Sequence, residues 1–336
     1  MKSVLLNAPR SLSVEEVEEP NRPGDGEVLV QVQRVTLCGS DIHYFLHGSH
    51  STKVQFPIVL GHEASGVVIA TGDNVTSVKP GDRVAIEPGI WCGRCVYCAR
   101  NQYQFCEKMQ FMASKGYPGA LRERVVWPES AVWKLPDRMS LDEGALLEPL
   151  SVAYAAMEGT DFGQASSALV LGAGSIGLLA CGLIRQLHPH VECFVLDNRK
   201  ERFDLARRQG IDTGRAIVSG DADAEFPAAD IVIDTTGHPG VIESAFRSMN
   251  KGGRILLIGL SRQPLGLDVM DLVYKGVTIK GSYRYSHTYP KLLELSDVHS
   301  FGTSSLITHR FGLGQAQEAF ETASAAQKSL KVVIEL

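Results

Sequence analysis

The feature that most constrains this chain is the glycine-rich stretch LGAGSIG, residues 171–177, which directly follows the apolar segment SALVL. Its glycines Gly172, Gly174 and Gly177 fit the pattern G-x-G-x-x-G, with a strand before it and a helix after it. Glycine is needed there because the turn is tight, a phosphate approaches the backbone and the helix packs closely on the strand. Residues 162–184 carry no charge and are long enough to span a bilayer. The glycines within them instead favour a strand, a turn and a buried helix.

The residues after the glycines predict which nucleotide binds. Asp197 ends the next apolar strand, 20 residues after Gly177. A carboxylate at this point accepts both ribose hydroxyls of NAD and repels the 2′-phosphate of NADP. The following Asn-Arg-Lys tripeptide weakly favours a phosphate, but we interpret it as the solvated start of a helix. We therefore expect NAD, with Gly172, Gly174, Ser175, Ile176, Gly177 and Asp197 as candidate cofactor-binding residues.

The spacing of apolar segments separates two kinds of region. Up to about residue 135, short strands between turn signals are expected, among them 27–37, 66–71 and 81–88. From residue 167, apolar strands alternate with helical segments, a pattern typical of a doubly wound parallel sheet. Further helices are expected after residue 285 and over 314–325, with strands at ITHRF and LKVVIEL. The fold class predicted is α/β, with a parallel sheet and a second, β-rich domain.

Length and charge exclude several classes of partner. A chain of 336 residues is long enough for two domains. The net charge is −5, and no basic run resembles a phosphate-binding surface, so nucleic acid is not expected. The first 20 residues lack the apolar core and the cleavage site of a secretory signal. We therefore expect a cytoplasmic protein without a membrane partner, whose thiols stay reduced.

Four of the seven cysteines lie within fifteen positions: Cys92, Cys95, Cys98 and Cys106. Thiolates at such short separations can close a tetrahedron around Zn²⁺. An iron–sulfur cluster usually has a shorter last gap, C-x₂-C-x₂-C-x₃-C, and disulfides are disfavoured in a reducing compartment. All four metal positions are then filled by protein. We therefore interpret this lobe as a structural zinc site and expect the chemistry to occur elsewhere.

A second set of metal-binding residue types lies outside the lobe. Cys38 and His62 follow strand-like segments, and Glu63 and Glu148 are carboxylates in apolar surroundings. Taken singly, a core thiol and a satisfied core histidine are the simpler interpretations. Because the same chain carries a nicotinamide-binding pattern, we interpret the set as a catalytic metal site.

These motifs together resemble the zinc-dependent medium-chain alcohol dehydrogenases. CGSDIHY, GHEASG, the four-cysteine lobe, LLEPLSVA and LGAGSIG occur in the family's order along essentially the whole chain. The glutamate at 148 and GSYRY at 281–285 resemble the polyol branch, which includes sorbitol, xylitol and L-idonate 5-dehydrogenases. The resemblance implies a GroES-like catalytic domain over 1–149, with the zinc lobe at 87–110, completed by 285–336. A Rossmann domain over 150–284 would be inserted between these parts.

The resemblance also implies roles for single residues. Cys38 and His62 would bind the catalytic zinc together with Glu63 or Glu148, a choice that the family leaves open. Ser40 and His43 would relay the proton, and Arg202 would lie near the adenosine ribose. The substrate-pocket positions are Tyr44, Phe111, Glu148, Arg284 and Tyr285. KGYPGALRERV, residues 115–125, departs from the Asp-Gly-Gly-aromatic stretch of many relatives, which leaves the particular substrate open.

The activity that follows from the resemblance is oxidation of a secondary hydroxyl of a polyol or sugar-derived hydroxy acid to a ketone. NAD accepts the hydride, and the two zinc ions are one catalytic and one structural. Threonine 3-dehydrogenase, another alcohol dehydrogenase of the family and a non-catalytic nucleotide-binding regulator are the alternatives. A homodimer or homotetramer is expected by analogy, paired through the parallel sheets with residues 252–260 as the edge.

Overall fold

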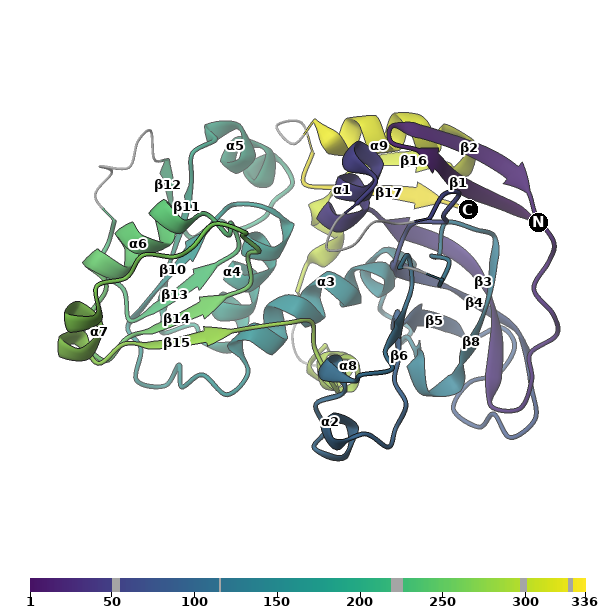
Figure 1. Ribbon diagram of the computed structural model, residues 1–336, viewed down its shortest axis with the longest axis horizontal. Coiled ribbons are helices and arrows are strands. Elements are labelled where there is room, and N and C mark those ends of the chain that lie inside the picture. Colours follow the sequence, from purple (N-terminus) through teal and green to yellow (C-terminus); the bar gives the residue numbers. More distant parts are fainter. Residues whose placement is uncertain (50–54, 115, 219–225, 297–300, 326–328) are drawn as a thin grey trace. The chain divides into compact units, whose positions relative to one another are not determined.

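The computed structural model describes residues 1–49, 55–114, 116–218, 226–296, 301–325 and 329–336. The chain forms two compact units (Figure 1). The first contains Met1–Glu148, Tyr289–Leu295 and Ile307–Leu336, and the second contains Pro149–Thr288 and Ser296–Leu306. The chain passes from the first unit into the second inside a single helix, α3 (Leu141–Met157).

The first unit is built on a seven-stranded sheet. Its strand order is β16-β17-β3-β4-β5-β9, and β8 also pairs with β3. Strand β3 (Glu27–Thr36) buries Val28, Val30 and Val32, because alternate residues of a strand point to the same side. The other elements are β1 (Lys2–Ala8), β2 (Ser11–Glu16), α1 (Gly39–His47), β4 (Glu63–Thr71), β5 (Arg83–Ile86), β6 (Gly89–Ile90), α2 (Val96–Ala99), η1 (Tyr103–Phe105), β7 (Gln110–Phe111), β8 (Arg124–Pro128), η2 (Glu129–Ala131), β9 (Val132–Lys134), α8 (Thr288–Leu295), β16 (Ile307–Gly312), η4 (Leu313–Gln315), α9 (Ala316–Ser324) and β17 (Lys331–Glu335).

Strand β17, from the end of the sequence, completes this sheet. It pairs antiparallel with β3, with Val333 opposite Thr36 and Ile334 opposite Val35. Segments that lie far apart in the sequence therefore share one hydrophobic core, in which Phe320 of α9 packs on Phe45 of α1.

The second unit has a six-stranded sheet in the order β12-β11-β10-β13-β14-β15, in which every pair is parallel. This is the doubly wound order with a switch point between β10 and β13, so the expected fold class is confirmed. Figure 1 shows the strands side by side with helices beside them. The elements are β10 (Ser167–Leu171), α4 (Ser175–Leu187), β11 (Glu192–Asp197), α5 (Lys200–Arg208), β12 (Arg215–Val218), β13 (Ile231–Asp234), α6 (Pro239–Ser248), β14 (Arg254–Leu257), α7 (Val269–Lys275), β15 (Thr278–Gly281) and η3 (Thr303–Leu306).

Two expectations about the second unit need correction. The segment 252–260 was expected at the sheet edge, but its strand β14 lies between β13 and β15. The terminal strand is β15, since the chain adds one more parallel strand after β14. In addition, residues 285–288 and Ser296–Leu306 belong to this unit rather than to the first. Thr303 and Leu306 are buried here and line one cavity together with Leu150 and Leu183.

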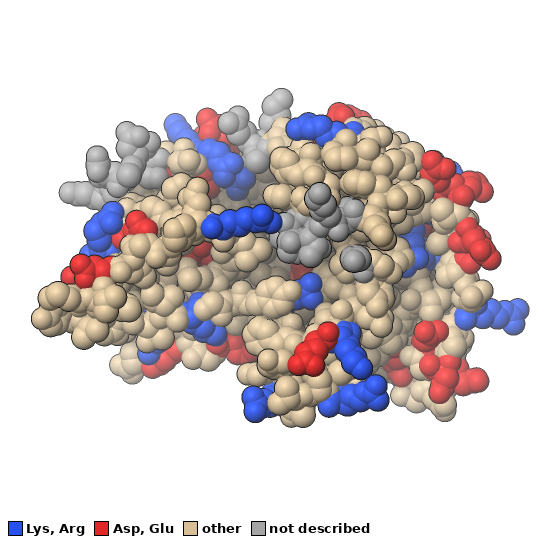
Figure 2. Space-filling view, viewed as in Figure 1, with Lys and Arg blue, Asp and Glu red and all other residues tan. Residues whose placement is uncertain are grey.

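On the face drawn in Figure 2, acidic and basic side chains are interspersed. Within the described ranges, every helix falls short of the length and apolar character needed to cross a bilayer.

Candidate metal centres and dinucleotide site

Four thiols converge in a short lobe of the first unit. The Sγ atoms of Cys92, Cys95, Cys98 and Cys106 all lie within 4.8 Å of one another. The turn between the first two has Gly93 at a φ of 69°, a conformation that side chains disfavour. The lobe then continues through α2, which carries Cys98, and η1, which leads to Cys106.

The sulfur spacing fits a tetrahedral metal. The Sγ atoms of Cys95 and Cys98 are 3.5 Å apart, and those of Cys92 and Cys98 are 4.0 Å apart. Zn–S bonds of about 2.3 Å in a tetrahedron place the sulfurs about 3.8 Å from one another. The backbone N–H of Cys98 is the main cause that lowers the pKa of Cys95 to about 6, whereas burial is the main cause that raises the pKa of Cys98 to about 12. Neighbouring thiols thus disfavour several negative charges at once unless a cation binds among them. With four protein ligands, such a centre is closed to substrate.

A second group forms where β3 ends and β4 begins. These strands pair antiparallel with Thr36 opposite Glu63, so the residues just beyond this pair lie close together. Cys38 follows β3 and His62 precedes β4. Ligand atoms of Cys38, His62 and Glu63 lie within 4.8 Å of one another. This group brings together three of the four residues that the sequence predicts, whereas Glu148 lies outside it.

Asp41, which the sequence interpretation missed, organises this group. Its buried carboxylate accepts hydrogen bonds from the N–H groups of Cys38 at 3.1 Å and Gly61 at 3.0 Å. Its Oδ1 is also 3.5 Å from Nδ1 of His62. A carboxylate on one ring nitrogen fixes the imidazole and leaves Nε2 for a metal. Burial lowers the pKa of His62, but the charges of Asp41 and Cys38 outweigh burial and raise this pKa well above its usual value. The group is therefore electrostatically suited to a cation.

Glu63 is held from its other side by a buried lysine. Lys331 of β17 places Nζ 2.5 Å from both carboxylate oxygens and also donates to the carbonyl of Leu37 at 3.1 Å. The Thr36 hydroxyl donates to the same carboxylate. Glu148 is buried in α3, and its negative charge contributes to raising the pKa of Lys331. The Cys38–His62 pair thus has the carboxylates of Asp41 and Glu63 beside it, with the Lys331 ammonium paired to Glu63.

The relay and pocket candidates differ in their placement. Helix α1 carries Ser40, half-buried, and His43, exposed, whose Nδ1 is 2.5 Å from the Ser49 carbonyl oxygen. Phe111 of β7 lies beside His62, with ring centroids 5.6 Å apart. Tyr44 is buried in the core around α1.

Arg284 and Tyr285 belong to the second unit. Arg284 has a φ of 51° and its guanidinium lies 5.1 Å from the Tyr283 ring centroid. Tyr285 is buried.

The glycine pattern forms the expected turn in the second unit. Gly172 follows β10 with a φ of 100°. A Cβ on Gly177 would lie 1.9 Å from the Gly172 carbonyl oxygen, so only glycine allows α4 to start this close to β10. Gly174 is the N-cap residue of α4 and provides no side-chain cap. The N-terminal N–H groups of this helix are therefore available to a phosphate.

Asp197 and Arg202 frame this turn. Asp197, buried at the end of β11, accepts from Ala173 N–H at 2.9 Å and from Arg199 N–H at 2.9 Å. Nη1 of Arg202 lies 3.0 Å from the position that a Gly174 Cβ would occupy. Its buried Nε has no hydrogen-bond partner among the residues that the structure describes. A guanidinium whose Nε lacks a partner, beside a glycine turn, fits an anionic dinucleotide.

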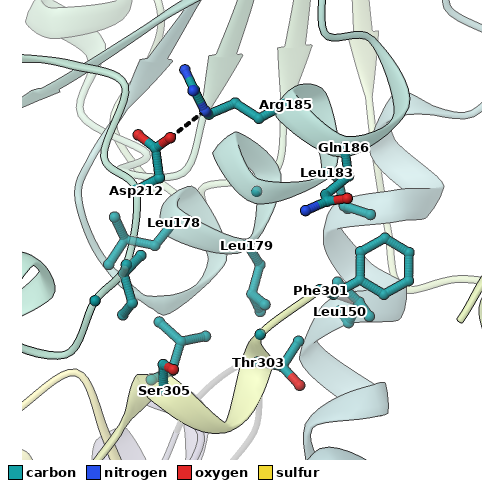
Figure 3. Close-up of a pocket in the computed structure, with 15 residues that line it drawn as sticks. Leu150, Leu178, Leu179, Leu183, Arg185, Gln186, Asp212, Phe301, Thr303 and Ser305 are labelled. Atoms are coloured by element: carbon teal, nitrogen blue, oxygen red, sulfur yellow. Dashed lines mark ion pairs between the residues drawn. The ribbon is translucent and has the colours of Figure 1, made fainter. Parts of the chain in front are cut away.

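A cavity of about 230 Å³ in the second unit lies apart from this turn. Leu178, Leu179 and Leu183 of α4 line one side of it, and Phe301 and Thr303 line another (Figure 3). Arg185 and Asp212 form an ion pair of 2.5 Å at its wall. None of the glycine-turn residues lines it, so this cavity is not part of the dinucleotide site.

Sequence reasoning also missed Lys331 and Glu87. Lys331 is the first residue of an apolar strand, and Glu87 lies between two strands. Neither position alone indicates that a charged side chain is buried. Glu87 precedes the cysteine lobe, and its carboxylate accepts hydrogen bonds from the Tyr103 hydroxyl at 2.6 Å and Trp133 Nε1 at 2.9 Å.

Comparison with known proteins shows the family to which the chain belongs. The profile of the alcohol dehydrogenase GroES-like domain matches residues 24–137, and that of zinc-binding dehydrogenases matches residues 175–297. A probable D-xylulose reductase A of Aspergillus clavatus is 36% identical, covering 99% of this chain and 96% of the relative. A sorbitol dehydrogenase of Bacillus subtilis is 33% identical, covering 99% and 97%. An alcohol dehydrogenase of Escherichia coli CFT073, solved in complex with NADH, superposes with a TM-score of 0.88 at 27% identity and covers 100% of this chain and 99% of its own.

The two family profiles, the order of the motifs and the full-length relatives agree. The chain belongs to the zinc-dependent medium-chain alcohol dehydrogenases, in the branch that contains the polyol dehydrogenases.

Proposed function

We propose that the protein oxidises a secondary hydroxyl of a polyol, or of a sugar-derived hydroxy acid, to a ketone and transfers the hydride to NAD⁺. The observation that carries this proposal is the pair of unlike metal-binding groups in the first unit. One has four thiols, and the other has Cys38, His62 and one carboxylate, which leaves a coordination position for substrate. The names of the relatives, a xylulose reductase and a sorbitol dehydrogenase, support a polyol.

The residues of the open group have separable tasks. Zinc bound there supplies Lewis acidity toward a substrate hydroxyl. Asp41 fixes the His62 ring, and Lys331 offsets the charge of Glu63. We assign the third ligand to Glu63, because its carboxylate lies with the ligand atoms of Cys38 and His62, and we assign Glu148, which lies outside this group, to the substrate.

The proton path proposed runs through α1. Because the Ser49 oxygen is an acceptor, Nδ1 of His43 carries the ring proton, and Nε2 is the acceptor atom of the ring. Ser40 stands one helical turn before His43, so both hydroxyl and imidazole can face the same side of the helix. The exposed ring then passes the proton to solvent.

We also propose a reducing, cytoplasmic location. All seven cysteines are free, including the buried Cys181 and Cys193, whose Sγ atoms are only 3.2 Å apart. Thiols this close persist as thiols in a reducing compartment.

The substrate class is tested with C4–C6 polyols and aldonates against ethanol, 2-propanol and threonine, with kcat/KM measured from NADH formation. If the pocket hydrogen-bonds several hydroxyls, kcat/KM should be about 10⁴-fold lower for analogues that lack them. Arg284→Ala should lower polyol and aldonate turnover, because we assign Arg284 to the substrate. The polyol assignment fails if ethanol or threonine is the best substrate, or if Arg284→Ala leaves polyol turnover unchanged.

Preference for NAD⁺ over NADP⁺ is expected from Asp197. Asp197→Ala should lower kcat/KM with NAD⁺ by about ten- to a hundredfold, the loss expected for hydrogen bonds to a charged group. It should also improve use of NADP⁺, since the repulsion of the 2′-phosphate is removed. Steady-state kinetics with both cofactors measure this. Wild-type protein that uses NADP⁺ equally well would refute the assignment.

Two zinc ions per chain are expected by elemental analysis. Cys106→Ser should remove one zinc and lower Tm, because it opens the closed centre. Cys38→Ala should remove the other and abolish turnover while the fold persists. Glu63→Gln should weaken binding of this second zinc, whereas Glu148→Gln should retain it. A fully active chain with one zinc, or iron in the cysteine lobe, contradicts this assignment.

We propose that the protein forms a homodimer through β15, with a homotetramer requiring a second interface. Helix α7, which precedes this terminal strand, exposes Val269, Met270, Val273 and Tyr274, each by 63–71%. Among the described residues, β15 has a neighbouring strand on one side only. A strand edge beside exposed apolar side chains is the usual setting for pairing with a second copy.

Light scattering coupled to gel filtration should therefore give the mass of a dimer. Val273→Glu should shift it toward the monomer. Val218→Glu, which places the same charge on an exposed valine of the opposite terminal strand β12, should leave it unchanged. A monomeric wild type, or dissociation only by Val218→Glu, would refute pairing through β15.

A further inference from the structure

Glu87 lies where the chain leaves the large sheet for the cysteine lobe. It follows β5, and β6 at the base of the lobe begins two residues later. Its side chain is 1% exposed. Burying a carboxylate costs free energy unless the carboxylate is fully hydrogen-bonded. The hydrogen-bond partners of Glu87 therefore indicate which segments it holds together.

Every polar atom of Glu87 is engaged, and the partners come from separate segments. The carboxylate accepts from the Tyr103 hydroxyl at 2.6 Å and from Trp133 Nε1 at 2.9 Å. Its carbonyl oxygen accepts from Trp127 Nε1 at 2.8 Å, and its N–H donates to the Ala131 carbonyl at 2.9 Å. Tyr103 belongs to the lobe, whereas the other three belong to β8, β9 and the turn between them. One carboxylate therefore joins the lobe to the sheet.

On the lobe side, this contact reaches the cysteines directly. Tyr103 lies between Cys98 and Cys106, and its carbonyl oxygen accepts the N–H of Cys106 at 2.8 Å. Its ring stacks on Trp91, with centroids 3.9 Å apart, and Trp91 immediately precedes Cys92. The position of Tyr103 thus depends on both ends of the four-thiol centre.

On the sheet side, the contact reaches the open metal group by two routes. Strand β5 pairs with β4, with Ile86 opposite Ala64, so Glu87 lies at the end of β4 where His62 and Glu63 are located. The second route runs through the base of the lobe, where Gly89 pairs with Phe111. The Phe111 ring packs beside His62.

Electrostatics agree with this placement. Burial is the main cause that raises the pKa of Glu87 to about 7, and the negative charge of Glu148 raises it further, while Tyr103 and Trp133 oppose the shift. Glu87 therefore lies close enough to Glu148 for their charges to interact. The two donors directed at the carboxylate, the Tyr103 hydroxyl and Trp133 Nε1, favour its ionised form and so oppose part of this rise.

We propose that Glu87 is a positioning residue that couples the four-cysteine centre to the open Cys38–His62 centre through its hydrogen bond to Tyr103. This inference rests on the function proposed above and deepens it. A metal in the closed centre would hold the lobe around Tyr103 in place. The Tyr103 hydroxyl then holds the Glu87 carboxylate through its hydrogen bond. Through strand pairing, Glu87 in turn holds the end of β4 beside His62 and the end of β7 that carries Phe111. The closed centre then sets the geometry of the open one.

The test uses the full-length protein with Co²⁺ in the open centre, whose visible spectrum reports ligand geometry without turnover. The zinc of the cysteine lobe is withdrawn with a chromogenic chelator whose zinc complex reports its release; a mercurial is avoided because it would also attack Cys38 of the open centre. In the wild type, release should change the cobalt spectrum. The Tyr103→Phe variant lacks the hydroxyl that binds Glu87. Its lobe should release metal about tenfold faster than the wild type, the factor expected for a lost hydrogen bond to a charged group. The cobalt spectrum of this variant should no longer change when the lobe loses its metal.

Two further variants make the result specific. Glu87→Gln should behave as Tyr103→Phe does, and the double variant should add little, because both remove the same hydrogen bond. Tyr97→Phe removes a hydroxyl elsewhere in the lobe and should match the wild type in release rate and spectral response. The inference is overturned if Tyr103→Phe releases metal at the wild-type rate, or if its cobalt spectrum responds as in the wild type. Both readouts are independent of turnover, so inactivity toward every polyol would refute the proposed function and leave this test decisive.

Discussion

The buried ion pair between Lys331 and Glu63 is the interaction on which the first unit most depends. It joins residues 268 positions apart and places both charges in the interior. Removing one partner of such a pair usually costs about 3–5 kcal/mol, because the other charge is left uncompensated. The same contact has a chemical consequence. Since Lys331 neutralises one of the carboxylates around Cys38 and His62, it limits the negative charge that a bound cation experiences. Lys331 therefore contributes both to the stability of the sheet and to the electrostatics of the open centre.

Much of the fold and site could be predicted because it rests on short-range patterns. The alternation of apolar strands and helices predicted the parallel sheet, and the spacing of Gly172, Gly174 and Gly177 placed its tight turn. What the sequence could not provide are contacts between distant segments. Asp41 reaches His62 only because β3 and β4 pair, and Lys331 reaches Glu63 only because β17 closes the sheet. The strand 252–260 was wrongly expected at the edge, since no local feature shows that β15 pairs outside it.

The two metal-binding groups differ in how their geometry is supported. The four thiols come from one short segment, so few other contacts are required to assemble them. Cys38, His62 and Glu63 come from the ends of two strands, and their positions depend on strand register, on the hydrogen bonds of Asp41 and on Lys331. A centre of the second kind is sensitive to distant changes in the sheet, which suits a site whose ligands must be held at an open coordination position.

The discontinuous composition of the first unit has a consequence for biosynthesis. Residues up to 148 are translated before the parallel sheet of the second unit, and β17 is translated after it. The ribosome thus delivers Cys92 to Cys106 early, and the nascent lobe has its complete ligand set while the first sheet still lacks a strand. Glu63 lacks its ion-pair partner Lys331 until the second unit has been translated. The four thiols of the lobe are consequently all translated before Lys331, whereas the open group acquires its full set of charged neighbours only with the last strand.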